Sequence, residues 1–147
     1  MSALDHLWRK NIRQLTPYSS ARDEYQGAEA TWLDANENCI ETAYNRYPDP
    51  YQKQLKAELA NYRQVDAENI FLGNGSDEAI DLLYRAFCRP GKDKVIIMPP
   101  TYGMYQVSAA INDVDVIEVP LDKDWQPDMA QLSAHWETTA IKLLFCC

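Results

Sequence analysis

The second half of the chain alternates between short apolar runs and segments in which apolar residues recur at helical spacing. The apolar runs are typical of buried strands and lie at Ile70–Leu72, 94–100 (KVIIMPP), 114–119 (VDVIEV) and 141–147 (IKLLFCC). The helical segments are 101–111, 127–136 and a helix that bears Ile80, Leu83, Tyr84 and Phe87 and stops at Pro90-Gly91. This alternation predicts βαβ units, and therefore an α/β fold whose mostly parallel sheet is covered by helices on both faces.

The first half is less regular and predicts fewer elements. A helix near the N-terminus is predicted to end at Pro17, with one face formed by Leu4, Leu7, Trp8, Ile12 and Leu15. The segment 32–38 (WLDANEN) predicts a short strand that runs into a turn. A second helix is predicted after Asp49 as N-cap and Pro50 as first residue, with an apolar stripe of Tyr51, Leu55, Leu59 and Tyr62.

Composition and charge narrow the class of protein. The 147 residues are 46% hydrophobic and 24% charged, which is typical of a globular domain with a core of its own. The net charge of −8 does not favour a broad surface for nucleic acid or anionic membrane. No apolar run approaches the roughly 20 residues of a spanning helix, and the N-terminus lacks the apolar core of a signal peptide. We therefore expect a cytoplasmic protein whose partners are neither nucleic acid nor membrane.

The four cysteines do not indicate a metal site. Cys39, Cys88, Cys146 and Cys147 show no C-x-x-C spacing, and the chain has two histidines. We expect no bound metal and reduced thiols, as is usual in the cytosol.

A Gly73-Asn74-Gly75 turn joins a predicted strand to a predicted helix, an order that can build an anion site. The helix dipole and the first N–H groups point at the turn, and glycine lets the ligand approach the backbone. No Lys follows the turn, which excludes a Walker A loop, and Glu78 stands where a dinucleotide fingerprint needs Gly or Ala. A single phosphate monoester, such as that of pyridoxal phosphate, would fit the amides of Ser76, Asp77 and Glu78. The turn alone is equally compatible with a capped helix start that binds nothing.

Two neighbouring features bear on whether the turn binds a ligand: one would oppose an anion, and the other favours a cofactor. The carboxylates of Asp77 and Glu78 would repel a phosphate, so we expect them to accept hydrogen bonds from backbone or other side chains and leave the amides free. The segment 99–105 (PPTYGMY) would present Tyr102 at the carboxyl edge of the sheet, where an aromatic ring can stack on a flat cofactor. A lone Tyr there could equally be a packing residue, and Arg46-Tyr47-Pro48 by itself indicates only a loop.

Together these motifs carry a resemblance. LDANEN (33–38), NRYPDP (45–50), GNGSDEAIDLLYRAFCRPGKDKVII (73–97) and PPTYGMY, in this order and spacing, resemble the histidinol-phosphate aminotransferases, as does LTPYSSAR (15–22). These are class I/II aminotransferases of pyridoxal-phosphate fold type I, and the resemblance covers the chain from about Leu15. One departure is Asp34, where the family often has Asn or another residue.

The resemblance implies a reaction, a cofactor and site residues. The reaction moves an amino group between L-histidinol phosphate and 2-oxoglutarate or glutamate in histidine biosynthesis, with pyridoxal 5'-phosphate as cofactor. The family's phosphate-binding turn matches Gly75, Ser76, Asp77 and Glu78, and the tyrosine that stacks on the pyridine ring matches Tyr102. A tyrosine that reaches the other subunit's cofactor phosphate in a homodimer matches Tyr47, and Tyr18 and Asn36 match positions near the substrate.

The resemblance also implies a domain organisation. Residues 1–45 would form an N-terminal helix and arm belonging to the small domain and dimer contact, and residues 46–147 would begin the large α/β domain. The family's Schiff-base lysine and the aspartate that pairs with the pyridine nitrogen would lie beyond Cys147, so no catalytic residue is assigned here. We expect the chain to be an N-terminal portion of the enzyme that is inactive alone.

Alternatives stay open from the sequence. Another class I/II enzyme, such as an aromatic aminotransferase or a threonine-phosphate decarboxylase, would share these motifs. A non-catalytic phosphate-binding α/β module would share the glycine turn.

Overall fold

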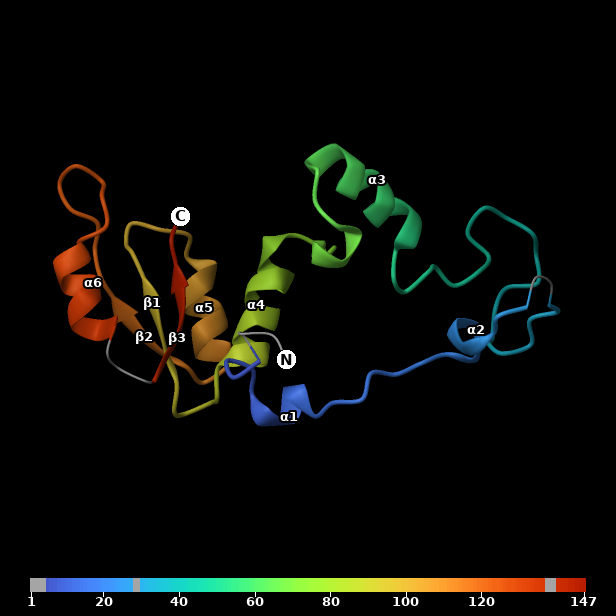
Figure 1. Ribbon diagram of the computed structural model, residues 1–147, viewed down its shortest axis with the longest axis horizontal. Coiled ribbons are helices and arrows are strands. Elements are labelled where there is room, and N and C mark those ends of the chain that lie inside the picture. The colour runs from blue at the N-terminus through green and yellow to red at the C-terminus, as the bar shows by residue number, and fades with distance from the viewer. Residues whose placement is uncertain (1–4, 28–29, 137–139) are drawn as a thin grey trace. The chain divides into compact units, whose positions relative to one another are not determined.

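The computed structural model describes residues 5–27, 30–136 and 140–147, which fall into two compact units (Figure 1). Residues 16–72 form one, called here the arm unit, and residues 1–15 with 73–147 form the other, called the α/β unit. The predicted boundary between residues 45 and 46 concerns the domains of a complete aminotransferase subunit and stays a prediction.

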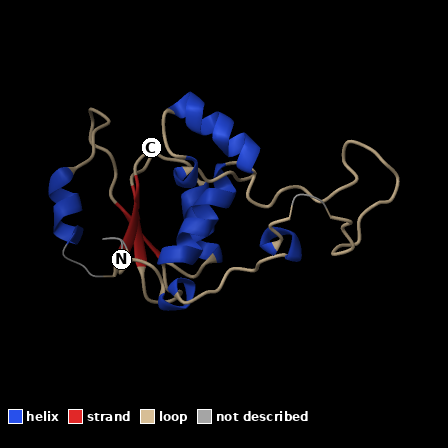
Figure 2. Ribbon diagram, turned by 45° about the vertical axis from the view of Figure 1, so that its right-hand side comes forward, coloured by secondary structure: helices blue, strands red, loops and turns tan. Residues whose placement is uncertain are grey.

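A parallel three-stranded sheet organises the α/β unit (Figure 2). Its strands are β1 (Lys94–Ile97), β2 (Asp115–Glu118) and β3 (Ile141–Phe145), in the order β2-β1-β3. Both pairings are parallel, with Val95 of β1 opposite Val116 of β2 and Leu143 of β3. The parallel sheet predicted from the apolar runs is confirmed.

Helices cover both faces of this sheet, as Figure 1 shows. Helices α4 (Ser76–Phe87) and α5 (Met104–Ile111) lie on one face and α6 (Met129–Trp136) on the other. Successive residues of β1 serve different cores. Val95 packs with Ile80, Tyr84, Cys88, Ala109 and Val114, whereas Ile96 packs with Met98, Val119 and Leu132. The predicted two-sided covering is confirmed, and it explains why the β1 sequence is continuously apolar.

Two buried polar contacts fix how α4 joins the sheet. The Asp93 carboxylate is fully buried and accepts hydrogen bonds from the Arg89 backbone at 2.7 Å and from Arg89 Nη2 at 2.6 Å. Burial opposes the ionisation of Asp93, but the hydrogen bonds from Arg89 outweigh it and hold the pKa of Asp93 below its usual range. The Tyr84 hydroxyl donates to the Tyr105 carbonyl at 2.8 Å and so ties α4 to α5.

Three segments differ from the prediction. Residues 70–72 form no strand, because no described strand pairs with them, and Phe71 is 57% exposed after a single turn of 3-10 helix, η1 (Ala67–Asn69). Residues 32–38 are likewise irregular. The N-terminal helix shortens to α1 (Lys10–Arg13), although Leu4 lies outside the described residues. The segment before it is held by packing instead, since Trp8 meets Phe87 with ring centroids 4.8 Å apart.

The described part of the arm unit contains two α-helices joined by irregular chain, besides the 3-10 turn η1. Helix α2 (Ala21–Glu24) begins with a capping box between Ser20 and Asp23. Helix α3 (Lys53–Arg63) begins three residues later than predicted, because Gln52 has a left-handed φ of 46°. The N-cap is therefore Gln52, and the prediction of Asp49 as N-cap with Pro50 as first helical residue is wrong, although the Asp49 carboxylate still accepts from the amide of Lys53 at 2.9 Å.

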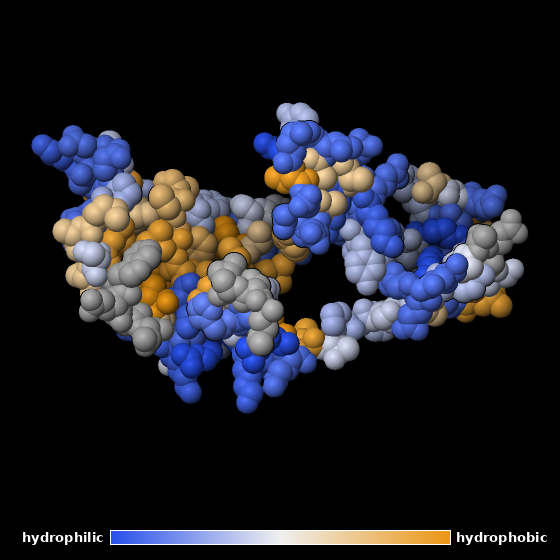
Figure 3. All heavy atoms as spheres, in the orientation of Figure 1, coloured by the Kyte–Doolittle hydropathy of each residue, from blue (hydrophilic) through white to orange (hydrophobic). Residues whose placement is uncertain are grey.

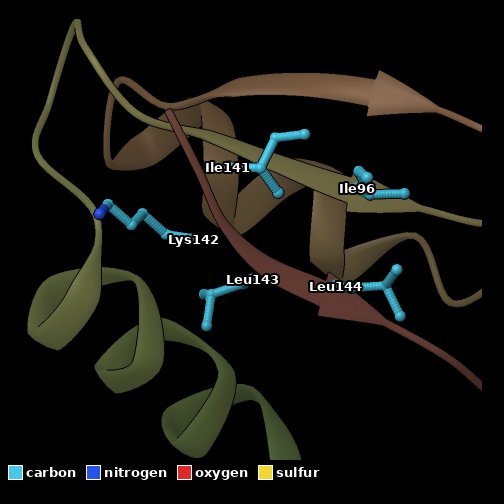
Figure 4. A pocket seen from close by; sticks show the side chains of 5 residues that line it. All are labelled: Ile96, Ile141, Lys142, Leu143 and Leu144. Atoms are coloured by element: carbon cyan, nitrogen blue, oxygen red, sulfur yellow. The ribbon is translucent and has the colours of Figure 1, made fainter. Parts of the chain in front are cut away.

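An apolar depression of about 300 Å³ lies along β3 (Figure 4). Its lining residues are Ile96, Ile141, Lys142, Leu143 and Leu144. Figure 3 shows the hydrophobic area that gathers over the sheet in the same unit. None of the glycine-turn residues lines this depression, so it is separate from the predicted anion site. Within the described part of the chain, no helix has both the length and the apolar character needed to span a membrane.

Candidate functional site

The glycine turn leads into α4 as predicted, and its geometry depends on Gly75. This residue has a φ of 81° and a ψ of 172°, a conformation that is essentially restricted to glycine. Gly75 holds the N-cap position without a side chain that could bond the first amides of the helix. A Cβ placed on Gly75 would meet no heavy atom within 4 Å, so the space beside this residue is open. The first amides of α4 have no side-chain cap and remain available to a ligand.

The two acids in the first turn of α4 are engaged by neighbouring groups. The Glu78 carboxylate accepts from the Asn74 amide at 2.5 Å, and Asp77 Oδ1 accepts from the Tyr102 hydroxyl at 3.1 Å. Both contacts are of the kind expected from the sequence. They use the carboxylates inside the turn, and neither consumes the amides of Ser76, Asp77 or Glu78.

Tyr102 lies beside the start of α4, as its position after β1 predicts. Its hydrogen bond to Asp77 raises the pKa of the phenol. Tyr105 meets the ring edge-on, with centroids 5.9 Å apart and an interplanar angle of 90°. The Tyr102 side chain remains 47% exposed, so part of its surface is free to contact a ligand.

These features fit the phosphate of pyridoxal 5'-phosphate. Ser76 is exposed and combines a hydroxyl with the first amide of a 12-residue helix, and the helix dipole favours an anion there. A flat aromatic side chain stands beside this position, held by a hydrogen bond and a ring contact. The arrangement can bind a phosphate ester and stack on an attached ring.

The other predicted site residues belong to the arm unit. Tyr18 is 88% exposed and Tyr47 is 63% exposed, and Asn36 is exposed as well. The structure thus brings Gly75–Glu78 and Tyr102 together in the α/β unit, whereas the roles of Tyr18, Asn36 and Tyr47 rest on the resemblance.

A charged cluster around Glu37 was not predicted. The Glu37 carboxylate is 5% exposed and accepts hydrogen bonds from the side chains of Arg22 and Arg46 and from the Tyr47 amide. The Arg22 hydrogen bond, followed by those from Tyr47 and Arg46, lowers the pKa of Glu37 from 4.5 to about 2. No periodicity marks this cluster, because its members lie 9 to 15 residues apart in irregular chain. The one sequence signal is that LDANEN contains two acids, Asp34 and Glu37, and that an arginine lies before this motif and another after it in the sequence.

Among residues 5–27, 30–136 and 140–147, no group of three His, Cys, Asp or Glu side chains is placed so that it could bind a metal ion.

Comparison with known proteins assigns the chain to a family. Residues 22–147 match the family described as aminotransferase class I and II, and the chain belongs to that family. Among its relatives is the histidinol-phosphate aminotransferase of Cytophaga hutchinsonii, which is 54% identical over 149 residues. That match covers 99% of this chain and 42% of the Cytophaga protein. The chain therefore spans about two fifths of the length of this curated relative.

Solved structures agree with this family. The histidinol-phosphate aminotransferase of Clostridium acetobutylicum superposes with a TM-score of 0.52 at 28% identity, over 61% of this chain and 26% of that chain. Cystalysin from Treponema denticola, whose crystal structure contains pyridoxal 5'-phosphate, superposes with a TM-score of 0.55 over 71% of this chain and 28% of its own. At 24% identity, the likeness to cystalysin shows the shared fold.

Proposed function

We propose that the protein to which this chain belongs is a pyridoxal-phosphate-dependent aminotransferase of histidine biosynthesis. It would transfer an amino group between L-histidinol phosphate and 2-oxoglutarate. The observation that carries the proposal is the start of α4, where the Gly75 backbone leaves the first amides uncapped beside Tyr102. The 54% identity to a histidinol-phosphate aminotransferase supports the choice of substrate.

Each site residue has a role in this proposal. The amides of Ser76, Asp77 and Glu78, with the Ser76 hydroxyl, would hold the cofactor phosphate at the helix start. The Tyr102 ring would lie against the pyridine ring and exclude water from that side. When bound, pyridoxal 5'-phosphate supplies the carbonyl group and the electron-withdrawing ring on which amino transfer depends.

The arm unit would complete the site. The Tyr47 hydroxyl would donate a hydrogen bond to the cofactor phosphate of the partner subunit in a homodimer, and Tyr18 and Asn36 would contact the substrate. A cytoplasmic location and the assignment of residues 1–45 to a small domain belong to the same proposal. The family resemblance supports these roles.

A substrate comparison tests the proposal. The full-length enzyme, loaded with pyridoxal 5'-phosphate, is assayed for glutamate formation from 2-oxoglutarate with L-histidinol phosphate or with L-phenylalanine or L-tyrosine as amino donor. We expect the highest kcat/KM with histidinol phosphate. A higher kcat/KM with an aromatic amino acid would favour an aromatic aminotransferase instead. Retention of the cofactor without any amino transfer would favour a phosphate-binding module.

Ser76→Ala provides the matched variant at the phosphate site. Loss of its hydroxyl should weaken binding of pyridoxal 5'-phosphate by about tenfold, the effect of one hydrogen bond to a charged group. Ser108→Ala is the control, because Ser108 is a buried residue of α5 and not part of the glycine turn. Equal cofactor affinity in both variants would count against a phosphate at Ser76.

A further inference from the structure

We propose that Glu37 is a positioning residue that holds Tyr47 in place for the cofactor site. This inference rests on the proposed function, because it assigns Glu37 a role through Tyr47. The Glu37 carboxylate is buried, and the proposed reaction does not use it in any other way.

Both oxygens of the Glu37 carboxylate are used. Oε1 accepts from Arg22 Nη1 at 3.1 Å and from the Tyr47 amide at 2.8 Å. Oε2 accepts from Arg46 Nη1 at 2.8 Å and from Arg22 Nη2 at 3.3 Å. One side chain therefore joins residues on both sides of it along the chain, from Arg22 in α2 to Tyr47 before α3.

This carboxylate compensates for missing secondary structure. Among residues 25–27 and 30–52 there is no helix or strand, so the backbone at Tyr47 is not held by the hydrogen bonds of a regular element. A bond from its amide to a buried, ionised carboxylate is among the stronger local restraints available to irregular chain. Two arginines neutralise the charge, which makes its burial tolerable.

The restraint acts on the backbone and leaves the Tyr47 ring free. The Tyr47 side chain is 63% exposed, whereas the Glu37 side chain is 5% exposed. Glu37 thus restrains the backbone from which the phenol projects, while the phenol itself stays accessible to a ligand. This is the arrangement that a tyrosine needs if it is to reach a cofactor phosphate as a preorganised donor.

Asp34 provides a matched control. It accepts from Arg22 Nη2 at 2.9 Å, so it shares one arginine with Glu37, but it has no contact with Tyr47 among the hydrogen bonds of the described residues. Neutralising Asp34 therefore perturbs the same cluster while leaving the Tyr47 amide bonded.

A double-mutant cycle in the full-length holoenzyme tests the inference. The variants are Glu37→Ala, Tyr47→Phe, the double variant and Asp34→Asn. The measurements are the dissociation constant of pyridoxal 5'-phosphate, and kcat and KM for histidinol phosphate. We expect Glu37→Ala and Tyr47→Phe each to weaken cofactor binding by about tenfold, the scale of one charge-assisted hydrogen bond. The double variant should be no weaker than the worse single variant, and Asp34→Asn should match the wild type.

The outcomes separate the two proposals. If Tyr47→Phe weakens cofactor binding but Glu37→Ala does not, or if the two effects multiply, the positioning role is wrong while the proposed function stands. If Tyr47→Phe has no effect, the role given to Tyr47 fails and the inference fails with it. Should Glu37→Ala not fold, Glu37→Gln carries the test in weaker form, because its neutral amide removes the charge from the bond to the Tyr47 amide and sets an N–H donor against an arginine; a wild-type cofactor affinity in Glu37→Gln would then count against the positioning role.

Discussion

Tyr102 is held by a hydrogen bond and by a ring contact, so substitutions that remove one or both should differ in their effect on cofactor binding. Tyr102→Phe removes the hydroxyl that donates to Asp77 but keeps the ring, which still meets Tyr105 edge-on. Tyr102→Ala removes the ring itself and with it the surface that would stack on the cofactor. We expect the alanine variant to lose pyridoxal 5'-phosphate by dialysis and the phenylalanine variant to retain most of it.

The cofactor absorbance spectrum of the dialysed holoenzyme measures this difference. Wild-type retention in both variants would make Tyr102 a packing residue only.

Glu37 should titrate well below the usual range of a glutamate. Its pKa is lowered from 4.5 to about 2 by hydrogen bonds from Arg22, Tyr47 and Arg46. The direction of the pH dependence follows from the linkage between protonation and folding. A carboxylate with a depressed folded-state pKa contributes stability that is fully present above pH 4.5 and is lost as the pH falls toward 2. The Tyr47 amide should therefore keep its NMR chemical shift down to about pH 3 and change below it.

Glu37→Gln is the control for that titration, because it removes the ionisable group. A midpoint near pH 4.5 for the Tyr47 amide in the wild type would show that Glu37 is not engaged as the structure places it.

At the level of elements, replacing the glycine before α4 and replacing the glycine before α5 with alanine should change the free energy of unfolding in opposite directions. Gly75→Ala forces an L residue into a φ of 81° and should lower the free energy of unfolding by about 1–3 kcal/mol. Gly103 has a φ of −62° in the right-handed helical region, so Gly103→Ala should raise it by about 0.4–1 kcal/mol. Neither added Cβ meets a heavy atom within 4 Å, so backbone conformation alone separates the two variants.

Urea denaturation of the two variants and the wild type, followed by circular dichroism, measures both changes. A stable Gly75→Ala variant would mean that the turn can adopt another conformation.

The elements that could be predicted from sequence are those whose partners are close along the chain. The strands β1, β2 and β3 follow one another through single helices, so continuous apolar runs such as that of β1 identified them. Residues 70–72 carry a similar run but form no strand, because an apolar run indicates burial and says nothing about which strand will pair with it. The N-terminal apolar spacing likewise predicted a longer helix than α1.

The site shows the same limit. The placement of Tyr102 beside the helix start follows from β1 and the glycine turn, which sequence patterns located. The sequence predicted that Asp77 and Glu78 would accept hydrogen bonds, but it did not predict that Tyr102 would be the donor to Asp77. The role of Glu37 could not be predicted, because its contacts lie within irregular chain, where no periodic sequence pattern indicates which residues meet.

At the level of the whole molecule, the proposed exchange of Tyr47 between subunits predicts complementation. Homodimers of Tyr47→Ala and of Tyr102→Ala should both be impaired. In a mixed dimer, one site would contain both defects and the other neither. Random mixing should then restore roughly a quarter of wild-type activity, because half of the dimers are mixed and each has one intact site.

The assay is transamination by refolded mixtures in which the mixed dimer has been verified by mass. Activity no higher than that of the separate homodimers would place Tyr47 in its own subunit's site or in none.

The alternation along β1 has a consequence for how this part of the protein can change in evolution. Val95 and Ile96 serve separate cores on opposite faces, so exchanging one apolar side chain for another disturbs a single core. Inserting or deleting one residue in the strand would instead turn every following side chain to the opposite face and disrupt both cores at once. Natural variation in chain length should therefore avoid residues 94–97 and collect in exposed connections, such as the turn around Asp122–Gln126, where the chain reverses between β2 and α6.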